Sequence, residues 1–190
     1  MRITPKLILC MVLLPAGVGS AGAQGQAPPP VPGLTLTTPA FADGGVIPPK
    51  FTQADAKPVS PKLEWTNVPP NTATFVLIVH DPDAAPQKMT EDVLHWMAFN
   101  IPGTVRELPE GVPANAKLAD GTTQAKNRRG DAGYMGMGAP AVGPYHHYTF
   151  ELFALDTKLD LGPDATRDDV LKAVNGHILG KGVLVGRFHR

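Results

Sequence analysis

Two stretches of the chain place acidic, imidazole and phenol side chains beside short loops rich in proline and glycine. The first is the segment 81–86, which begins with Asp81 and is followed by His95. The second ends in His146 and Tyr148. Polar side chains at strand ends next to rigid loops are typical of a small-ligand pocket. A phenol and imidazoles can donate to a phosphoryl or carboxyl oxygen, and a carboxylate can orient an imidazole or receive an ammonium group. The residue types therefore favour binding of a small anion or polar headgroup.

The alternation of side chains along β-strands tests whether these groups can meet. Each shares a strand face with other side chains: Asp81 with Leu77 and Val79, His95 with Met97 and Phe99, and His146 with Tyr148 and Phe150. Where three such strand ends converge, two imidazoles, a phenol and a carboxylate surround one cavity. The glycine-rich segment 136–138, which includes Gly138, can add backbone N–H donors.

The elements that must position these residues are short strands. From Leu34 onward, apolar runs alternate with proline and glycine, which leaves little room for long helices. The clearest predicted strands are residues 74–81, 95–101, 146–155 and 183–188. The first is apolar on both faces, which predicts a central position in the sheet.

One helix is predicted near the C-terminus. Thr166 is placed to be its N-cap, Asp169 occupies the capping-box position, and Gly176 is a candidate for its end. The expected fold is mainly β: a single domain, residues 34–190, of antiparallel sheets arranged like a β-sandwich, with a short C-terminal helical segment.

Residues 1–23 have the layout of a secretory signal peptide. Arg2 and Lys6 precede an apolar run, and Ala23 ends a small-residue cleavage signal. The run is too short for a membrane anchor. Cys10 lies inside it and follows a bulky leucine, which disfavours a lipoprotein signal. We expect a periplasmic or secreted protein with a proline-rich linker at 24–33 and no membrane span in the mature chain.

The composition of the mature chain excludes some function classes. Cys10 is the only cysteine, so the domain cannot depend on disulfides. Removal of Arg2 and Lys6 lowers the 17 basic residues to 15, against 17 acidic ones. A net negative charge argues against a nucleic-acid binder or a protein that attaches to anionic membranes.

Several segments resemble the phosphatidylethanolamine-binding protein family, and more closely its bacterial branch, often labelled Raf kinase inhibitor-like. The resemblance extends in order from Leu34 to Arg190. Its clearest carriers are Asp81-Pro82-Asp83-Ala84-Ala85-Pro86, His95-Trp96, Gly133-Tyr134, and His146-His147-Tyr148. The resemblance implies an anion pocket at Asp81, His95, Pro140, His146 and Tyr148. Together with Gly138, these are the predicted ligand-binding residues.

Three features depart from the family pattern. An additional alanine, Ala84 or Ala85, precedes Pro86, and the segment before Pro140 has lost two prolines. His147 stands where the family usually has arginine, on the strand face opposite His146. The first two departures alter the expected pocket walls.

The predicted function is an exported, non-catalytic binding protein for a small phosphate-containing anion or phospholipid headgroup, with no tightly held cofactor. One alternative is a metal-dependent hydrolase or phosphotransferase that uses Asp81, His95 and His146. Another is a protein-binding role of the protease-inhibitor type, with a protein as partner. Nucleophilic catalysis is disfavoured, because Ser60 is the only serine after residue 23 and no nucleophile elbow surrounds it.

Overall fold

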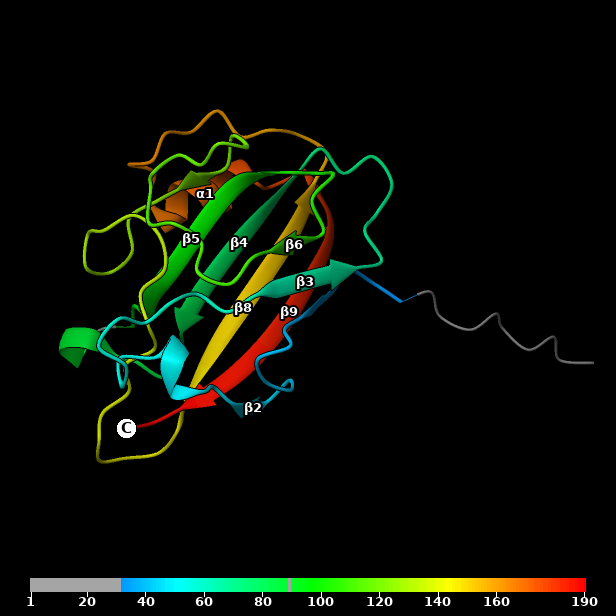
Figure 1. The fold of residues 1–190 in the computed structure, drawn as a ribbon. Coiled ribbons are helices and arrows are strands. Elements are labelled where there is room, and N and C mark those ends of the chain that lie inside the picture. The colour runs from blue at the N-terminus through cyan, green and yellow to red at the C-terminus, as the bar shows by residue number, and fades with distance from the viewer. Residues whose placement is uncertain (1–31, 89) are drawn as a thin grey trace, which may run out of the picture. The chain divides into compact units, whose positions relative to one another are not determined.

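Strand β4 (Thr74–Asp81) is the centre of the larger of two sheets, and all eight of its residues are buried. The structure is a computed structural model that describes residues 32–88 and 90–190. On either side, β4 pairs antiparallel with β5 (Val93–Pro102) and β8 (His146–Leu155) (Figure 1). The six-stranded sheet is completed by β9 (Ile178–Phe188), β7 (Thr123–Gln124) and β2 (Gly45–Val46), in the order β2-β9-β8-β4-β5-β7.

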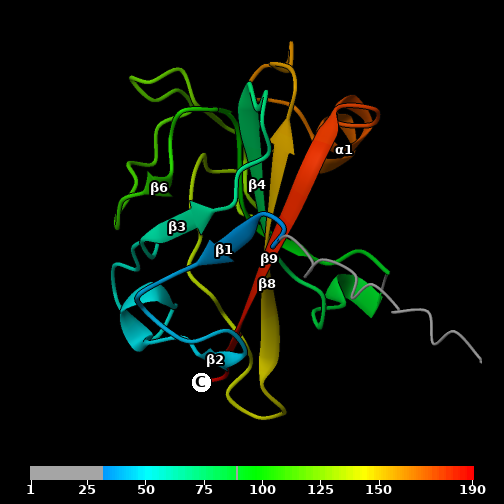
Figure 2. The same cartoon turned by 90° about the vertical axis from the view of Figure 1, so that its right-hand side faces the viewer.

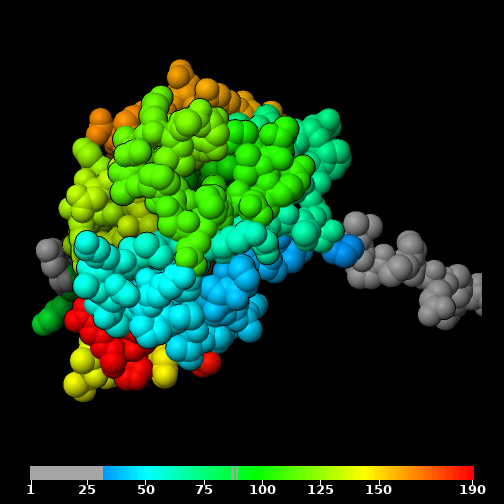
Figure 3. Space-filling model, viewed as in Figure 1, coloured from blue at the N-terminus to red at the C-terminus, as the bar shows by residue number. Residues whose placement is uncertain are grey.

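A three-stranded sheet packs on one face of the large sheet, which we call the front face. It consists of β1 (Thr35–Thr37), β3 (Leu63–Thr66) and β6 (Glu107–Leu108), in the order β1-β3-β6. The main core lies between the two sheets and contains both tryptophans, Trp65 and Trp96. In the space-filling view, two parts of the chain cover this face of the large sheet: a blue-to-cyan part that carries β1, the 3₁₀ turn η1 (Pro49–Phe51) and β3, and a green part that carries β6 (Figure 3).

The other face, the back face, carries helix α1 (Arg167–Ala173), so that the large sheet is covered on both sides (Figure 2). A second core joins Val170 and Val174 to the sheet residues Val76, Ile78, Met97 and Phe99. Two 3₁₀ turns, η1 (Pro49–Phe51) and η2 (Pro86–Lys88), complete the elements. Within the described residues, none of the helices has the length and apolar character that a membrane crossing requires.

The predicted fold class is confirmed: two mainly antiparallel sheets and one short C-terminal helix. The predicted strand bounds match β4 and β8, whereas β9 begins at Ile178 rather than Val183. The first half of β9 escaped prediction because Gly180 and Gly182 break its apolar pattern. A Cβ atom at Gly182 would lie 2.9 Å from the carbonyl oxygen of Leu34, so β9 needs glycine where the chain entering β1 crosses it. The predicted signal peptide, with Cys10, and most of the 24–33 linker lie outside the described residues.

The predicted helix start is confirmed in detail. The Thr166 hydroxyl accepts from the backbone N–H of Asp169, and the Asp169 carboxylate accepts from the backbone N–H of Thr166. This reciprocal capping box satisfies two N–H groups at the start of a seven-residue helix that has few internal hydrogen bonds.

Thr166→Ala should lower the free energy of unfolding by about 1 kcal/mol, because it removes the capping oxygen. Chemical denaturation measures this change. Thr104→Ala, at an exposed loop position, is the matched control and should change stability by less than about 0.5 kcal/mol. Equal effects of the two substitutions would contradict the role of the cap.

Candidate ligand-binding site

Asp81 ends β4 with a buried carboxylate that is held by three donors. Oδ2 lies 2.8 Å from Nδ1 of His146 at the start of β8. Oδ1 accepts from the backbone N–H groups of Asp83 and Ala84, at 3.0 and 3.1 Å. The N–H bonds make a turn in which the aspartate side chain holds the loop that follows the strand. Asp81 therefore fixes both the His146 ring and the first residues of the β4–β5 connection.

His95 joins the same site because of a bulge in β5. Val79 pairs with Trp96, whereas the next residue of β4, His80, pairs with Leu94, so His95 is the additional residue. The predicted face was wrong: Met97 and Phe99 belong to the back core, whereas His95 turns to the front. There its ring packs edge-on against Tyr148, with centroids 5.2 Å apart. A bulge reverses the side-chain alternation at one position, and strict alternation would have placed His95 with Met97 on the back face.

The ring nitrogens of His95 have assignable roles. Nδ1 lies 2.9 Å from the carbonyl oxygen of Met135, and since a carbonyl can only accept, Nδ1 carries the hydrogen. Burial lowers the pKa of His95, and the carbonyl of Met135 and the charge of Asp81 offset this only in part. At neutral pH the ring is therefore uncharged, and Nε2 remains as an acceptor.

Tyr148 lies beneath the site and is fully buried. Its hydroxyl makes no hydrogen bond of good geometry within the described part of the chain. Burial raises the pKa of this phenol, the nearby Asp81 carboxylate raises it further through its charge and as an acceptor, and the backbone N–H of Gly138 counteracts this in part. The phenol is therefore protonated at neutral pH, and its proton can serve Asp81 or a ligand. Buried hydroxyls without a partner are rare, which makes this one a candidate ligand contact.

A cavity of about 310 Å³ opens at this end of the sheet, a volume at the small end of the range for ligand pockets. Five of the six predicted residues line it: Asp81, His95, Gly138, Pro140 and His146. Tyr148 is the sixth and is not among the lining residues. Sequence reasoning did not assign Gln53, Asp83, Val93 and Met135, which also line the cavity, and Ala84, Ala85 and Pro86 form its loop wall.

Gln53 comes from the segment after η1 and could not be found by local patterns. Its backbone N–H donates to the carbonyl of Met137, and its side-chain amide donates to the carbonyl of Gly136. A Cβ atom on Gly138 would lie 2.3 Å from Nε2 of Gln53. The glycine at this position therefore lets the loop wall approach Gln53 closely.

Two further histidines, His147 and His80, have carboxylate partners. His147 faces away from the pocket, and both its backbone N–H and its ring bind the Asp83 carboxylate. The backbone hydrogen bond is the largest influence that lowers the pKa of Asp83. His80 lies on the back face, where Nδ1 is 2.6 Å from Asp92.

The metal alternative lacks a geometric basis in the described chain. Among residues 32–88 and 90–190, no three His, Cys, Asp or Glu side chains are grouped so that they could hold a metal ion. Asp81 and His146 bond directly to each other, and His95 directs Nδ1 to a backbone carbonyl.

The comparison with known families decides what kind of protein carries this site. The family model for phosphatidylethanolamine-binding protein matches residues 37–189. The chain belongs to the phosphatidylethanolamine-binding protein family. Members of this family are generally binding proteins with a ligand-binding pocket.

Relatives and solved structures agree with this assignment. A UPF0098 protein of Methanothermobacter thermautotrophicus is 43% identical over 157 residues, which cover 83% of this chain and 99% of the relative. The crystal structure of E. coli YbcL, described as a new member of the mammalian PEBP family, has a TM-score of 0.74 at 27% identity. The structural match covers 84% of this chain and 99% of YbcL. A phosphatidylethanolamine-binding protein homolog from Chlamydia trachomatis has a TM-score of 0.72 at 30% identity, covering 83% and 98% of the two chains.

His95→Gln should make the free energy of unfolding fall less steeply as the pH is lowered. Because the folded-state pKa of His95 lies below its ordinary value of 6.5, the unfolded chain binds this proton more tightly. The free energy of unfolding of the intact protein therefore falls as the pH drops below about 6.5, and this contribution is absent in the variant. Unfolding curves measured from about pH 8 to about pH 5.5 test this. At the alkaline end His95 is neutral in both the folded and the unfolded chain, so the free energies of unfolding of the intact protein and the variant should change with pH in parallel there. Identical slopes throughout would contradict the assignment of a buried neutral ring.

Proposed function

We propose that this protein binds a small phosphate-containing anion or a phospholipid headgroup in the Asp81–His146 cavity, without catalysing a reaction on it. The observation that carries the proposal is the convergence there of a paired carboxylate, two imidazoles and a buried hydroxyl that makes no hydrogen bond of good geometry to the described residues. The cavity volume of about 310 Å³ suits a headgroup rather than a long acyl chain.

The donors and acceptors of the cavity favour a ligand that carries both. With each Nδ1 engaged, His95 and His146 offer Nε2 to a ligand. The neutral His95 ring accepts, which suits the P–OH of a phosphate monoanion. His146 keeps Nδ1 on Asp81 and presents Nε2 beside it. The Tyr148 hydroxyl and the backbone N–H groups near Gly138 supply donors for phosphoryl oxygens.

The carboxylate of Asp81 is compatible with an anionic ligand because its charge is already compensated. One imidazole N–H and two backbone N–H groups satisfy its oxygens. A nearby ammonium group, as in phosphoethanolamine, would gain from what remains of this negative charge. The site therefore suits a headgroup with charges of both signs.

The surroundings of the one serine of the mature chain support a non-catalytic role. Ser60 is buried, and its hydroxyl accepts from the backbone N–H of Val112. No described histidine pairs with it, so it has no base that could activate it as a nucleophile.

Isothermal titration with inorganic phosphate and with phosphoethanolamine, in the presence of a chelator, tests the binding role. Asp81→Asn and His146→Gln should weaken binding by about 10- to 100-fold, the range for hydrogen bonds that involve a charged group. Tyr148→Phe removes only the hydroxyl and should weaken phosphate binding while leaving the fold intact.

His177→Gln is the matched control for these variants. His177 also directs Nδ1 to an aspartate at 2.8 Å, but its partner Asp156 follows the far end of β8. This variant should bind phosphate as the intact protein does. Absence of binding by the intact protein, or binding that needs added metal, would refute the proposed function.

We also propose that the protein is exported and acts in the periplasm or outside the cell. The support is the charged, apolar and small-residue order of residues 1–23. Expression of the full chain in a Gram-negative host should yield a periplasmic product that begins at Gln24, as determined by mass spectrometry. Leu13→Arg, which interrupts the apolar run, should keep the product in the cytoplasm. A cytoplasmic product that retains residues 2–23 would contradict export.

A further inference from the structure

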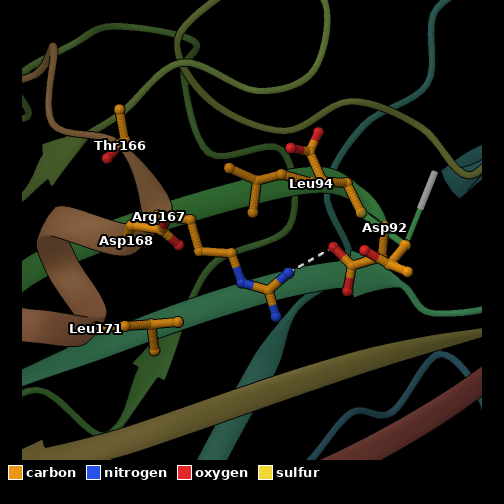
Figure 4. A pocket seen from close by; sticks show the side chains of 8 residues that line it. Asp92, Leu94, Thr166, Arg167, Asp168 and Leu171 are labelled. Atoms are coloured by element: carbon orange, nitrogen blue, oxygen red, sulfur yellow. Dashed lines mark hydrogen bonds and ion pairs between the residues drawn. The ribbon is translucent and has the colours of Figure 1, made fainter.

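A second, charged cavity lies on the back face of the large sheet, between the start of β5 and helix α1 (Figure 4). Its volume is about 560 Å³, and its lining includes Asp92, Leu94, Arg167 and Leu171. The Arg167 side chain extends from the helix across this cavity, and Nη1 donates to Oδ1 of Asp92 (Figure 4). The cavity therefore contains a direct ionic link between α1 and the residue that precedes β5.

Asp92 is also bound from β4. Its Oδ2 lies 2.6 Å from Nδ1 of His80, whose side chain is 11% exposed. On its other side, Nε2 of His80 is 3.5 Å from Glu151 of β8. Glu151 in turn lies 3.4 Å from Lys181 of β9. A continuous chain of charged groups thus connects the helix to three strands of the sheet.

The pKa values of Asp92 and Glu151 agree with these contacts to His80. Burial acts to raise the pKa of Asp92, but the hydrogen bonds from Arg167 and His80 outweigh it and hold the pKa below its ordinary value. The hydrogen bond from His80 is the largest influence that lowers the pKa of Glu151. Both carboxylates are therefore ionised at neutral pH.

The two charged sites are joined by consecutive residues of β4. Asp81 faces the ligand cavity and holds the start of the β4–β5 connection through the N–H groups of Asp83 and Ala84. His80 faces the back and holds the end of the same connection through Asp92. The first part of the connection, from Asp83 to Pro86, lines the ligand cavity, and its last part, Thr90 to Asp92, lines the back cavity.

We propose that Arg167 and His80 are positioning residues for the ligand pocket, which they do not touch, and that they act by anchoring Asp92. The inference rests on the proposed function, since the anchored connection forms a wall of the proposed ligand pocket. With Asp92 anchored, the connection is held at both ends and its first part stays against the cavity. Without that anchor, only the Asp81 turn restrains it.

Asp92 is thus held from two sides, by His80 of β4 and by Arg167 of α1. Asp92 and Glu151 contact the His80 ring directly, Lys181 contacts Glu151, and Glu91 and Asp168 line the same back cavity. Loss of either Arg167 or His80 should leave the end of the β4–β5 connection less restrained.

The test uses the full mature protein with Arg167→Gln, Arg167→Lys and His80→Gln. Amide hydrogen exchange of residues 83–88 is measured without ligand, and phosphate affinity is measured by titration. Lys126→Gln is the matched control, since it removes an exposed ion pair with Asp164, a residue of the segment that leads into α1. Because Arg167 is only half-buried, its variants remain testable even if His80→Gln impairs folding.

Arg167→Gln should speed exchange of residues 83–88 and weaken phosphate binding by about tenfold, whereas Arg167→Lys should recover part of both. His80→Gln should shift both readouts in the same direction as Arg167→Gln, because it removes the other contact of Asp92. A merely structural role would give no recovery of exchange and affinity in Arg167→Lys.

Unchanged exchange at residues 83–88 in Arg167→Gln would overturn the inference, whatever the ligand affinity. So would an equal effect of Lys126→Gln. If the intact protein fails to bind phosphate, the proposed function fails, and the exchange measurement still decides whether Arg167 and His80 hold the connection.

Discussion

The burial of β4 on both faces is the constraint on which the rest of the structure depends. Its last two residues, His80 and Asp81, are polar and nearly inaccessible, with 9% and 3% of their surface exposed. Buried ionisable groups are costly unless they are paired, so each must find partners within the protein. Asp81 finds His146 and two loop N–H groups on the front, and His80 finds Asp92 and Glu151 on the back. This requirement ties the end of one strand to β8, to the entry of β5 and to the helix.

The ligand pocket follows from the same constraint. Because Asp81 engages Nδ1 of His146, that ring presents its other nitrogen, and the β5 bulge brings a second imidazole beside it. In the site, both imidazoles therefore use Nδ1 for a hydrogen bond within the protein and present Nε2 to a ligand. Such preorganisation lowers the entropy cost of binding a small ligand.

The departures from the family pattern have physical counterparts in the structure. His147, in place of the usual arginine, ties β8 to the pocket loop through Asp83. Ala84 and Ala85 contribute to the cavity lining directly. In the segment where two prolines are missing, Gly138 packs so closely against the Gln53 amide that a side chain there would displace Gln53. These changes lie in the pocket loops or on the outer side of β8, and they leave Asp81, His95 and His146 together.

The sequence by itself determined the features that depend on neighbouring residues. The apolar run of β4, the alternation in β8 and the capping box at Thr166 each arise from contacts within a few positions, and all three were predictable. The family motifs likewise pointed to Asp81, His95, Pro140, His146 and Tyr148, and the first four of these line one cavity. Only the tertiary structure decided the face of His95, because a bulge is a mismatch between two strands and has no signature in one of them. It also decided the start of β9, where glycine is needed for a crossing strand, and the pairing of His80 with Asp92 and Glu151. These features depend on residues that are distant in sequence and become neighbours only when the sheet forms.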